Sequence, residues 1–333
     1  MRVWLRGHPF IMSVLATAIA SAGALLIAHV TGADAVGRAF EEVEPGWIGL
    51  IAVAEACTYP AYAIAYRSVA RTLGHAPLGL PMVGRVVAAG FGPFHVTGGF
   101  GIDKQALHAW HEDERSARVL VLGLGMLEWA ILAPTAAVTA IALLAQRADM
   151  LPSLLWPWAV AVPLGLGAAL WASAPGRRRR LARIRGQRRR WLADLLDGAG
   201  VLHTLVTRPR TYAAAWLGTA AYWLADIVAF YAACRTFGLD LGPGKVIIAY
   251  ATGYAATRRS LPLAGAGVTE VLMTYSLYWV RQPLAPALAA VVAYRAFNFL
   301  LATVPALLAR RHVEPLLEAS DELRRTERRR RRR

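Results

Sequence analysis

The residues of this chain that could do chemistry are a few charged side chains inside long apolar segments. Arg295 lies near the middle of the apolar segment 284–309, and Asn298 follows about one helical turn later on the same face. A guanidinium suits phosphate because its planar fork donates two charge-assisted hydrogen bonds at once. We therefore expect Arg295 and Asn298 to bind a phosphate group. The alternative is an internal ion pair of the arginine, with Glu270, Asp226 or Glu128 as its partner.

Two carboxylates, Glu128 and Asp226, also lie deep in apolar segments, 119–145 and 212–234. A charge in hydrocarbon costs on the order of 3 kcal/mol on insertion scales, so such residues are candidates for function. One reading is proton coupling, in which burial raises the pKa of a carboxyl group and protonation accompanies substrate movement. The other reading is charge pairing with an arginine, for which the candidates are Arg85, Arg258, Arg259 and Arg295.

Two glycine-rich stretches repeat one pattern half a chain apart. Gly99-Phe100-Gly101-Ile102-Asp103-Lys104 and Gly265-Ala266-Gly267-Val268-Thr269-Glu270 share Gly-x-Gly, then Ile or Val, and a charge at the sixth position. Such loops can present backbone N–H groups to an anionic headgroup, although glycine is also what a tight turn requires. The candidate substrate-binding residues are therefore Arg85, His95, Gly99, Gly101, Lys104, Arg258, Arg259, Gly265, Gly267, Glu270, Arg295 and Asn298.

The elements that must position these residues are membrane helices. Of the 333 residues 56% are hydrophobic and only 17% are charged, a composition that a soluble globule rarely has. A bilayer core needs about 20 apolar residues per helix. Six segments meet this need: 9–30, 47–66, 119–145, 151–173, 212–234 and 284–309. Two more, 77–101 and 246–280, are interrupted by Gly, Pro and Arg, so we expect an all-α polytopic protein of about eight membrane helices.

The net charge of +16 comes from two arginine runs. Residues 177–190 supply +9 and residues 324–333 supply +7, and both runs adjoin apolar segments, which is how charge that orients membrane helices is placed. We therefore expect topology anchoring, with contact to anionic lipid as a secondary role and no specific nucleic-acid binding. The protein is predicted to lie in the cytoplasmic (inner) membrane. Its N-terminus, the 177–190 loop and its C-terminus are predicted to face the cytoplasm.

This orientation requires segment 77–101 to enter from the cytoplasm and return, because one full crossing there would place the arginines of 177–190 outside. Segment 246–280 is either a hairpin entering from the outside or two oblique crossings. Opposite entry of the two broken segments predicts an inverted repeat with a midplane transport site. Residues 191–207 are predicted to form an amphipathic interfacial helix.

The domain organisation predicted from these segments is simple. Residues 1–310 form one transmembrane domain, with halves at about 1–173 and 191–310 joined by the basic loop 174–190. Residues 311–333 are predicted to be a disordered basic tail. The N-terminal segment could also be a signal peptide cleaved after Ala33-Asp34-Ala35, but its apolar run is long enough to span.

Several of these residues together resemble a known family. The run from Pro262 to Glu270, followed by Tyr294-Arg295 in the last span, is similar to the pattern of the lysylphosphatidylglycerol synthase transmembrane region, also described as flippase-like. The stretch from Gly92 to Asp103 occupies the place of the family's first Pro-Gly loop, so the resemblance covers roughly 10–310. It implies a lipid-translocating domain. Ala264 and Thr269 depart from the family pattern, which leaves room for a different substrate. We expect no aminoacyl-transferase domain after Arg310.

Three functions follow as hypotheses. The first is translocation of an anionic phospholipid or a polyprenyl-phosphate-linked lipid between leaflets; the others are a membrane subunit of a transferase acting on lipid headgroups, and a non-transporting scaffold. The sequence contains no catalytic, cofactor or metal motif, so we expect no enzyme activity, no cofactor and no metal. The expected partners are membrane lipids, and homo-oligomerisation is left open. The polar stretch His108, His111, Glu112, Asp113 and Glu114 is predicted to be a charged surface helix rather than a metal site.

Overall fold

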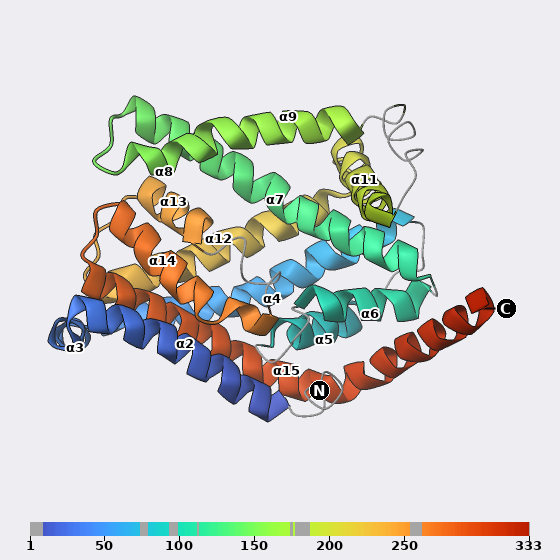
Figure 1. Cartoon of the computed structure of the whole chain (residues 1–333), viewed down its shortest axis with the longest axis horizontal. Coiled ribbons are helices and arrows are strands. Elements are labelled where there is room, and N and C mark those ends of the chain that lie inside the picture. Colours follow the sequence, from blue (N-terminus) through green and yellow to red (C-terminus); the bar gives the residue numbers. More distant parts are fainter. Residues whose placement is uncertain are drawn as a thin grey trace.

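The computed structural model of the chain is built of helices (Figure 1). It describes residues 9–73, 79–92, 99–111, 113–173, 176, 187–253 and 262–332. Within these ranges helix is the only regular secondary structure, which confirms the predicted all-α fold.

Six stretches of helix in the described ranges are long and apolar enough to cross a bilayer, and they coincide with the six predicted spans. They are α2 (Pro9–Thr31), α4 (Ile48–Ala70), α7 (Glu114–Ala145), the continuous run α8 (Pro152–Trp156), η3 (Pro157–Ala161) and α9 (Val162–Ser173), α12 (Ala213–Thr236), and α15 (Leu284–Arg332). The η3 segment is π-helical where Pro157 cannot donate the usual backbone hydrogen bond. The chain is thus a multi-pass membrane protein.

Both broken segments consist of two short helices. The first holds α5 (Leu80–Phe91) and extends ten residues past its predicted end at 101, because its second helix α6 covers Gly99–His111. The second holds α13 (Pro243–Gly253) and α14 (Val268–Trp279), the latter preceded by the turn η4 (Pro262–Gly265). Helices of 11 to 13 residues are about 16–20 Å long, well short of a bilayer core of about 30 Å. Their length favours a hairpin over two crossings for 246–280 as well as for 77–101.

The eight helices that flank and form these hairpins make two units with the same internal packing. In the first unit α4, α5, α6 and α7 pack in sequence, and α12, α13, α14 and α15 do so in the second. The contacts between units are reciprocal: α4 packs on α12, α5 packs on α15, and α13 packs on α7. The repeat predicted from the glycine motifs therefore corresponds to two structurally equivalent units.

The two units run in opposite directions. Glu44, just before α4, donates its backbone N–H to the carbonyl of Thr236 at the end of α12 (2.9 Å), so α4 and α12 are antiparallel. Glu114 at the start of α7 lies 3.9 Å from Arg324 late in α15, so α7 and α15 are antiparallel too. This is the inverted arrangement that the sequence predicts.

The loops predicted to share a side of the membrane gather at one end of the bundle. At the left end in Figure 1, Leu151 before α8 donates its N–H to the carbonyl of Trp279 at the end of α14, and Asp149 lies 3.9 Å from Arg281. The end of α9, the helix α11 (Gln187–Thr207) and the C-terminus lie at the opposite end. The alternation of sides is as predicted; which end faces the cytoplasm stays a prediction.

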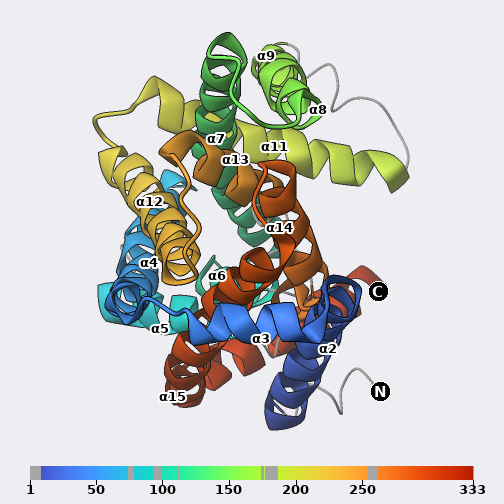
Figure 2. The same ribbon diagram turned by 90° about the vertical axis from the view of Figure 1, so that its left-hand side faces the viewer.

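Two helices lie across the ends of the bundle. Both α11 and the short α3 (Ala33–Glu41) are seen nearly end-on in Figure 1 and lengthwise in Figure 2. Leu196, Val201 and Leu205 of α11 are buried, whereas Thr207 is exposed. The predicted helix over 191–207 is present with one side buried, and its location at a membrane interface stays a prediction.

The tail predicted to be disordered differs in the structure, where α15 continues to Arg332. Val313 and Ser320 are buried, and Leu316 and Leu317 pack on the hydrophobic core. These four positions follow the i, i+3, i+4, i+7 spacing of an amphipathic helix, and Arg, Glu and Leu are good helix formers. The charge of the arginine run concealed this apolar stripe.

Candidate functional site

Arg295 forms a buried ion pair at the contact of α14 and α15. Its Nε lies 2.8 Å from Oε1 of Glu270, and the two side chains are 3% and 2% exposed. Its guanidinium carbon also lies 4.5 Å from the centre of the Phe299 ring. The structure therefore has Arg295 in the internal ion pair, the alternative to direct phosphate binding, and Glu270 is the partner.

Glu270 also connects this pair to the second glycine loop. Its Oε2 accepts the backbone N–H of Gly267 at 2.6 Å, which caps the N-terminus of α14. Gly265 and Gly267 have φ of 71° and 82°, where residues with a Cβ are strained. Gly267 also lies against Gly23 of α2: a Cβ at Gly23 would come within 3.2 Å of the Gly267 backbone. The two glycines are thus required by the turn and by the close approach of α2.

Asn298, one turn after Arg295, donates from Nδ2 to Oε2 of Glu55 at 2.9 Å. Glu55 lies on α4 and is fully buried, so this bond joins the last helix of the second unit to the first helix of the first unit. Glu55 is not among the site residues predicted from the sequence. It carried the same signal as Glu128, a carboxylate within an apolar span.

Asp226 accepts hydrogen bonds from two tyrosines. Tyr294 donates to its Oδ1 at 2.7 Å, and Tyr250 donates to its Oδ2 at 2.5 Å. Asp226 is fully buried on α12, and the tyrosines lie on α15 and α13. Tyr294, the neighbour of Arg295 in sequence, therefore positions α15 against α12. We refer to Glu55, Asp226, Glu270, Arg295 and Asn298 as the core cluster.

Glu128 is buried on α7, and its backbone carbonyl accepts the Nε1–H of Trp223 at 2.9 Å. This contact ties α7 to α12 and explains the position of the helix rather than the role of the carboxylate. Proton coupling at Glu128 or Asp226 stays a prediction.

The candidates from the first half lie elsewhere. Gly99 and Gly101 begin α6, as Gly265 and Gly267 precede α14, whereas Arg85 is exposed on α5. Lys104 lies 3.4 Å from Glu114 at the end of the bundle that carries the C-terminus. The three other candidates lie outside the described residues: His95, Arg258 and Arg259.

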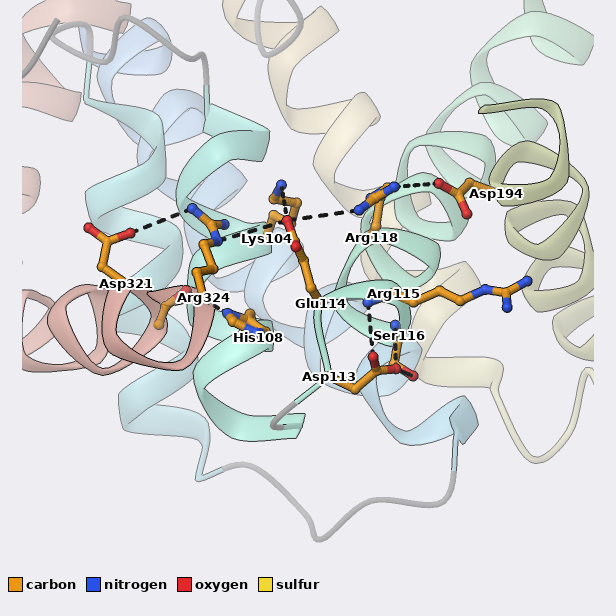
Figure 3. A network of polar contacts seen from close by, with 11 residues as sticks. Lys104, His108, Asp113, Glu114, Arg115, Ser116, Arg118, Asp194, Asp321 and Arg324 are labelled. Carbon is orange, nitrogen blue, oxygen red and sulfur yellow. Dashed lines mark hydrogen bonds and ion pairs between the residues drawn. The ribbon is translucent and has the colours of Figure 1, made fainter. Parts of the chain in front are cut away.

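Lys104 belongs to a second group of charges, shown in Figure 3. Glu114 lies within 4 Å of Lys104, Arg118 and Arg324, and Arg118 also bonds Asp194 of α11 at 2.6 Å. We refer to Lys104, Glu114, Arg118, Asp194 and Arg324 as the rim cluster. It fastens α6, α7, α11 and the extension of α15 to one another.

The polar stretch 108–114 is only partly the surface helix that was predicted. His108 is fully buried, and its Nδ1 lies 2.8 Å from Oγ of Ser320 in the α15 extension. Asp113 caps α7 by accepting the backbone N–H of Ser116 at 2.9 Å and of Arg115 at 3.2 Å. Within the described ranges no group of three His, Cys, Asp or Glu residues could hold a metal ion.

Residues 106–306 match the family model of the lysylphosphatidylglycerol synthase TM region. The match includes Glu128, Asp226 and the Glu270–Arg295 pair, and it begins after Gly99 and Gly101. None of the curated proteins matches the chain. Because the family model covers more than half of the 333 residues, the chain belongs to the lysylphosphatidylglycerol synthase TM region family.

Proposed function

We propose that this protein moves an anionic lipid, a phospholipid or a polyprenyl-phosphate-linked lipid, between the leaflets of the cytoplasmic membrane. The observation that carries the proposal is the buried Arg295–Glu270 pair, on the second hairpin and the last span of an inverted pair of units. Broken helices at equivalent places in two inverted halves are where transporters bind their substrates. Membership of a lipid-related membrane family supports the same class of substrate.

The proposed chemistry is an exchange of anionic partners at Arg295. Breaking a buried ion pair by removing one partner costs about 3–5 kcal/mol, so Glu270 can leave Arg295 only if another anion takes its place. A lipid phosphate is such an anion, and it can accept two guanidinium N–H groups at once. Release of Glu270 also frees the N–H of Gly267, so movement of a phosphate would alter the cap of α14.

The test is lipid movement in proteoliposomes. Fluorescent phosphatidylglycerol in the inner leaflet should become accessible to external dithionite quencher faster with the protein than in protein-free vesicles. Leu217→Ala, at a position of α12 that is 69% exposed, is the control variant and should move lipid as fast as wild type. If wild type moves neither phosphatidylglycerol nor polyprenyl phosphate, translocation is contradicted. A new lipid species found by mass spectrometry would instead support a headgroup transferase.

The orientation is tested separately. The Asp149 side chain is 88% exposed. In a protein whose exposed Cys57 is replaced by serine, the cysteine of the Asp149→Cys variant should react with an impermeant maleimide added to intact cells. Asp321→Cys, in the α15 extension at the opposite end, should not react. The reverse pattern would contradict the cytoplasmic placement of the C-terminus.

A further inference from the structure

A cavity of about 830 Å³ lies between α7, α9 and α11, in the described part of the chain. Its walls are almost entirely apolar: His203 is the one titratable side chain among the residues that line it. The aromatic walls are Phe100 of α6, Trp129 of α7 and Trp216 of α12. None of the core cluster residues lines the cavity, so it is a separate site.

The cavity is elongated along a membrane span. Its α7 wall extends from Val121 to Pro134, thirteen residues further along, which corresponds to about 20 Å of helix. One leaflet of the hydrocarbon core is about 15 Å thick, so the cavity is as long as an extended hydrocarbon chain within a leaflet. Because α7 and α9 are long and apolar enough to span a membrane, the cavity between them is expected to lie at the depth of the lipid hydrocarbon chains.

Glycines build the walls closely. A Cβ at Gly123 would lie 2.7 Å from Cβ of Val201, and a Cβ at Gly198 would lie 2.8 Å from Cβ of Leu122, so α11 can lie directly on α7 only because both positions are glycine. The ring of Phe100 lies beside Gly125, where its Cζ would be in ordinary contact, at 3.6 Å, with a Cβ. Phe100 stands between Gly99 and Gly101, so the first glycine motif forms part of the cavity wall.

Positive charge lies at one end of the cavity. Arg118, one turn before Val121 and Leu122, bonds Asp194, which directly precedes Leu195 and Leu196 of the cavity wall. The Arg118 side chain is 42% exposed and lies 2.6 Å from Asp194 and 3.8 Å from Glu114, so of its five N–H groups some still face solvent and can donate to a phosphate. An apolar slot with a partly exposed arginine at its end matches an acyl chain with a phosphate above it.

We propose that this cavity holds one acyl chain of an anionic phospholipid from the leaflet at the α11 end, with the phosphate beside Arg118. This site rests on the proposed function, since its lipid would be bound next to Phe100 at the start of the re-entrant α6, before it moves between leaflets. A phospholipid fits better than a polyprenyl phosphate, because a polyprenyl chain is several times longer than one leaflet.

The test is photo-crosslinking in nanodiscs with phosphatidylglycerol that carries a diazirine on one acyl chain. Crosslinks should concentrate on peptides of α7 and α11 that line the cavity. Ala199→Trp fills the cavity from α11 and should lower this yield at least about tenfold, the loss expected for about two excluded methylene groups. Ala169→Trp fills it from the exposed face of α9, and this second variant serves if the first fails to fold.

The matched control is Leu217→Trp, which adds the same ring on a lipid-exposed face outside the cavity and should leave the yield unchanged. Arg118→Gln should remove the preference of the site for phosphatidylglycerol over diacylglycerol with the same chain. Equal crosslinking of the exposed faces of α12 and α15, no effect of the filling variants, or displacement by polyprenyl phosphate at equal concentration would overturn the proposal.

The crosslinking yield measures occupancy and not movement, so the two proposals fail separately. Capture at the cavity without movement of any lipid would leave this site in place and contradict translocation. Movement without capture at the cavity would leave translocation in place and contradict this site.

Discussion

The core cluster and the rim cluster both hold helices together with charged side chains, but they do so in different surroundings. Arg295 and Glu270 are 3% and 2% exposed at 2.8 Å, whereas Lys104 and Glu114 are 30% and 29% exposed at 3.4 Å. Two charges 4 Å apart attract by about 4 kcal/mol at an effective dielectric constant of 20 and by about 1 kcal/mol in water. Ion pairs of the same kind therefore have different consequences at the two places.

The difference indicates which cluster can serve as a switch. At the rim, water and salt replace any partner that leaves, so breaking one contact costs little. In the core, Arg295 and Glu270 cannot separate unless another charge replaces one of them. Tight control by a charged substrate is therefore expected in the core, and mechanical fastening at the rim.

The largest effect is expected from Arg295→Met. This change leaves the Glu270 carboxylate buried without the arginine, so the free energy of unfolding should fall by about 3–5 kcal/mol. Combining it with Glu270→Met should recover most of this loss, because buried ion pairs can be replaced by apolar side chains of similar size at little cost. Thermal unfolding in detergent measures both. Equal destabilisation of the single and double variants would show that the pair is not the coupled unit described here.

A smaller effect is expected from Asn298→Leu, which removes the donor to Oε2 of Glu55. Hydrogen bonds to charged groups contribute about 1.5–3 kcal/mol, so unfolding should be easier by that amount. Glu55→Gln, which keeps an oxygen acceptor facing Asn298, is the matched control and should cost less. A loss below about 0.5 kcal/mol for Asn298→Leu would mean that this bond does not hold α15 to α4.

Next in size is the cap of α7 at the rim. Burial raises the pKa of the Asp113 carboxyl, but hydrogen bonds from Ser116 and Arg115 outweigh it and hold the pKa below its usual value. Since the folded-state pKa is lowered, the stabilisation is present above the unfolded pKa of about 3.9 and is lost as the pH falls through the folded value.

The cap is tested with Asp113→Ala, which should cost about 1 kcal/mol at pH 7. The difference from wild type should shrink below about pH 4. Asp113→Asn caps a helix equally well without titrating, so its stability relative to Asp113→Ala should not change over this pH range. A wild-type advantage that persists unchanged at pH 3 would contradict the role of the ionised carboxylate.

The smallest effect is expected from Arg324→Ala in the rim cluster. Its distances to Glu114 and Asp321 are 3.9 and 3.6 Å, and partly exposed pairs of this kind contribute about 0.2–1 kcal/mol. The loss should vanish at 1 M salt, where the Debye length is about 3 Å. Arg325→Ala, at an exposed neighbouring position, is the control. A salt-independent loss as large as that of Asn298→Leu would erase the contrast between the clusters.

More of the fold than of the site could be predicted from the sequence. The length of the apolar segments alone locates the six spans. The requirement that the arginine runs lie on one side of the membrane identifies 77–101 as broken. Both signals belong to continuous segments of the chain. The tail is the exception, since the stripe from Val313 to Ser320 was read as part of a charged run. A periodicity count over 311–323 would have found it.

Site residues are predicted one at a time, and their partners are not. An ionisable residue in an apolar span is recognisable, as Asp226 and Arg295 show and as Glu55 would have shown. For Asp226 the sequence left proton coupling and pairing with an arginine open, and it gave no sign of the hydrogen bonds from Tyr250 and Tyr294, because which side chains meet across helices depends on the rotation and crossing of those helices. Lys104 likewise shares a motif position with Glu270 but lies in the other cluster.

The measurement that tests the central claim most directly is lipid movement by the Arg295→Met, Glu270→Met double variant. The pair is removed as a unit, so the fold should lose only the cap that Glu270 provides to the Gly267 N–H, about 1 kcal/mol, and a loss of lipid movement in the folded variant reports on function. If Arg295 binds the lipid phosphate, proteoliposomes with this variant should move phosphatidylglycerol no faster than protein-free vesicles. Movement at the wild-type rate would show that the pair only holds α14 to α15, and would contradict the proposed site.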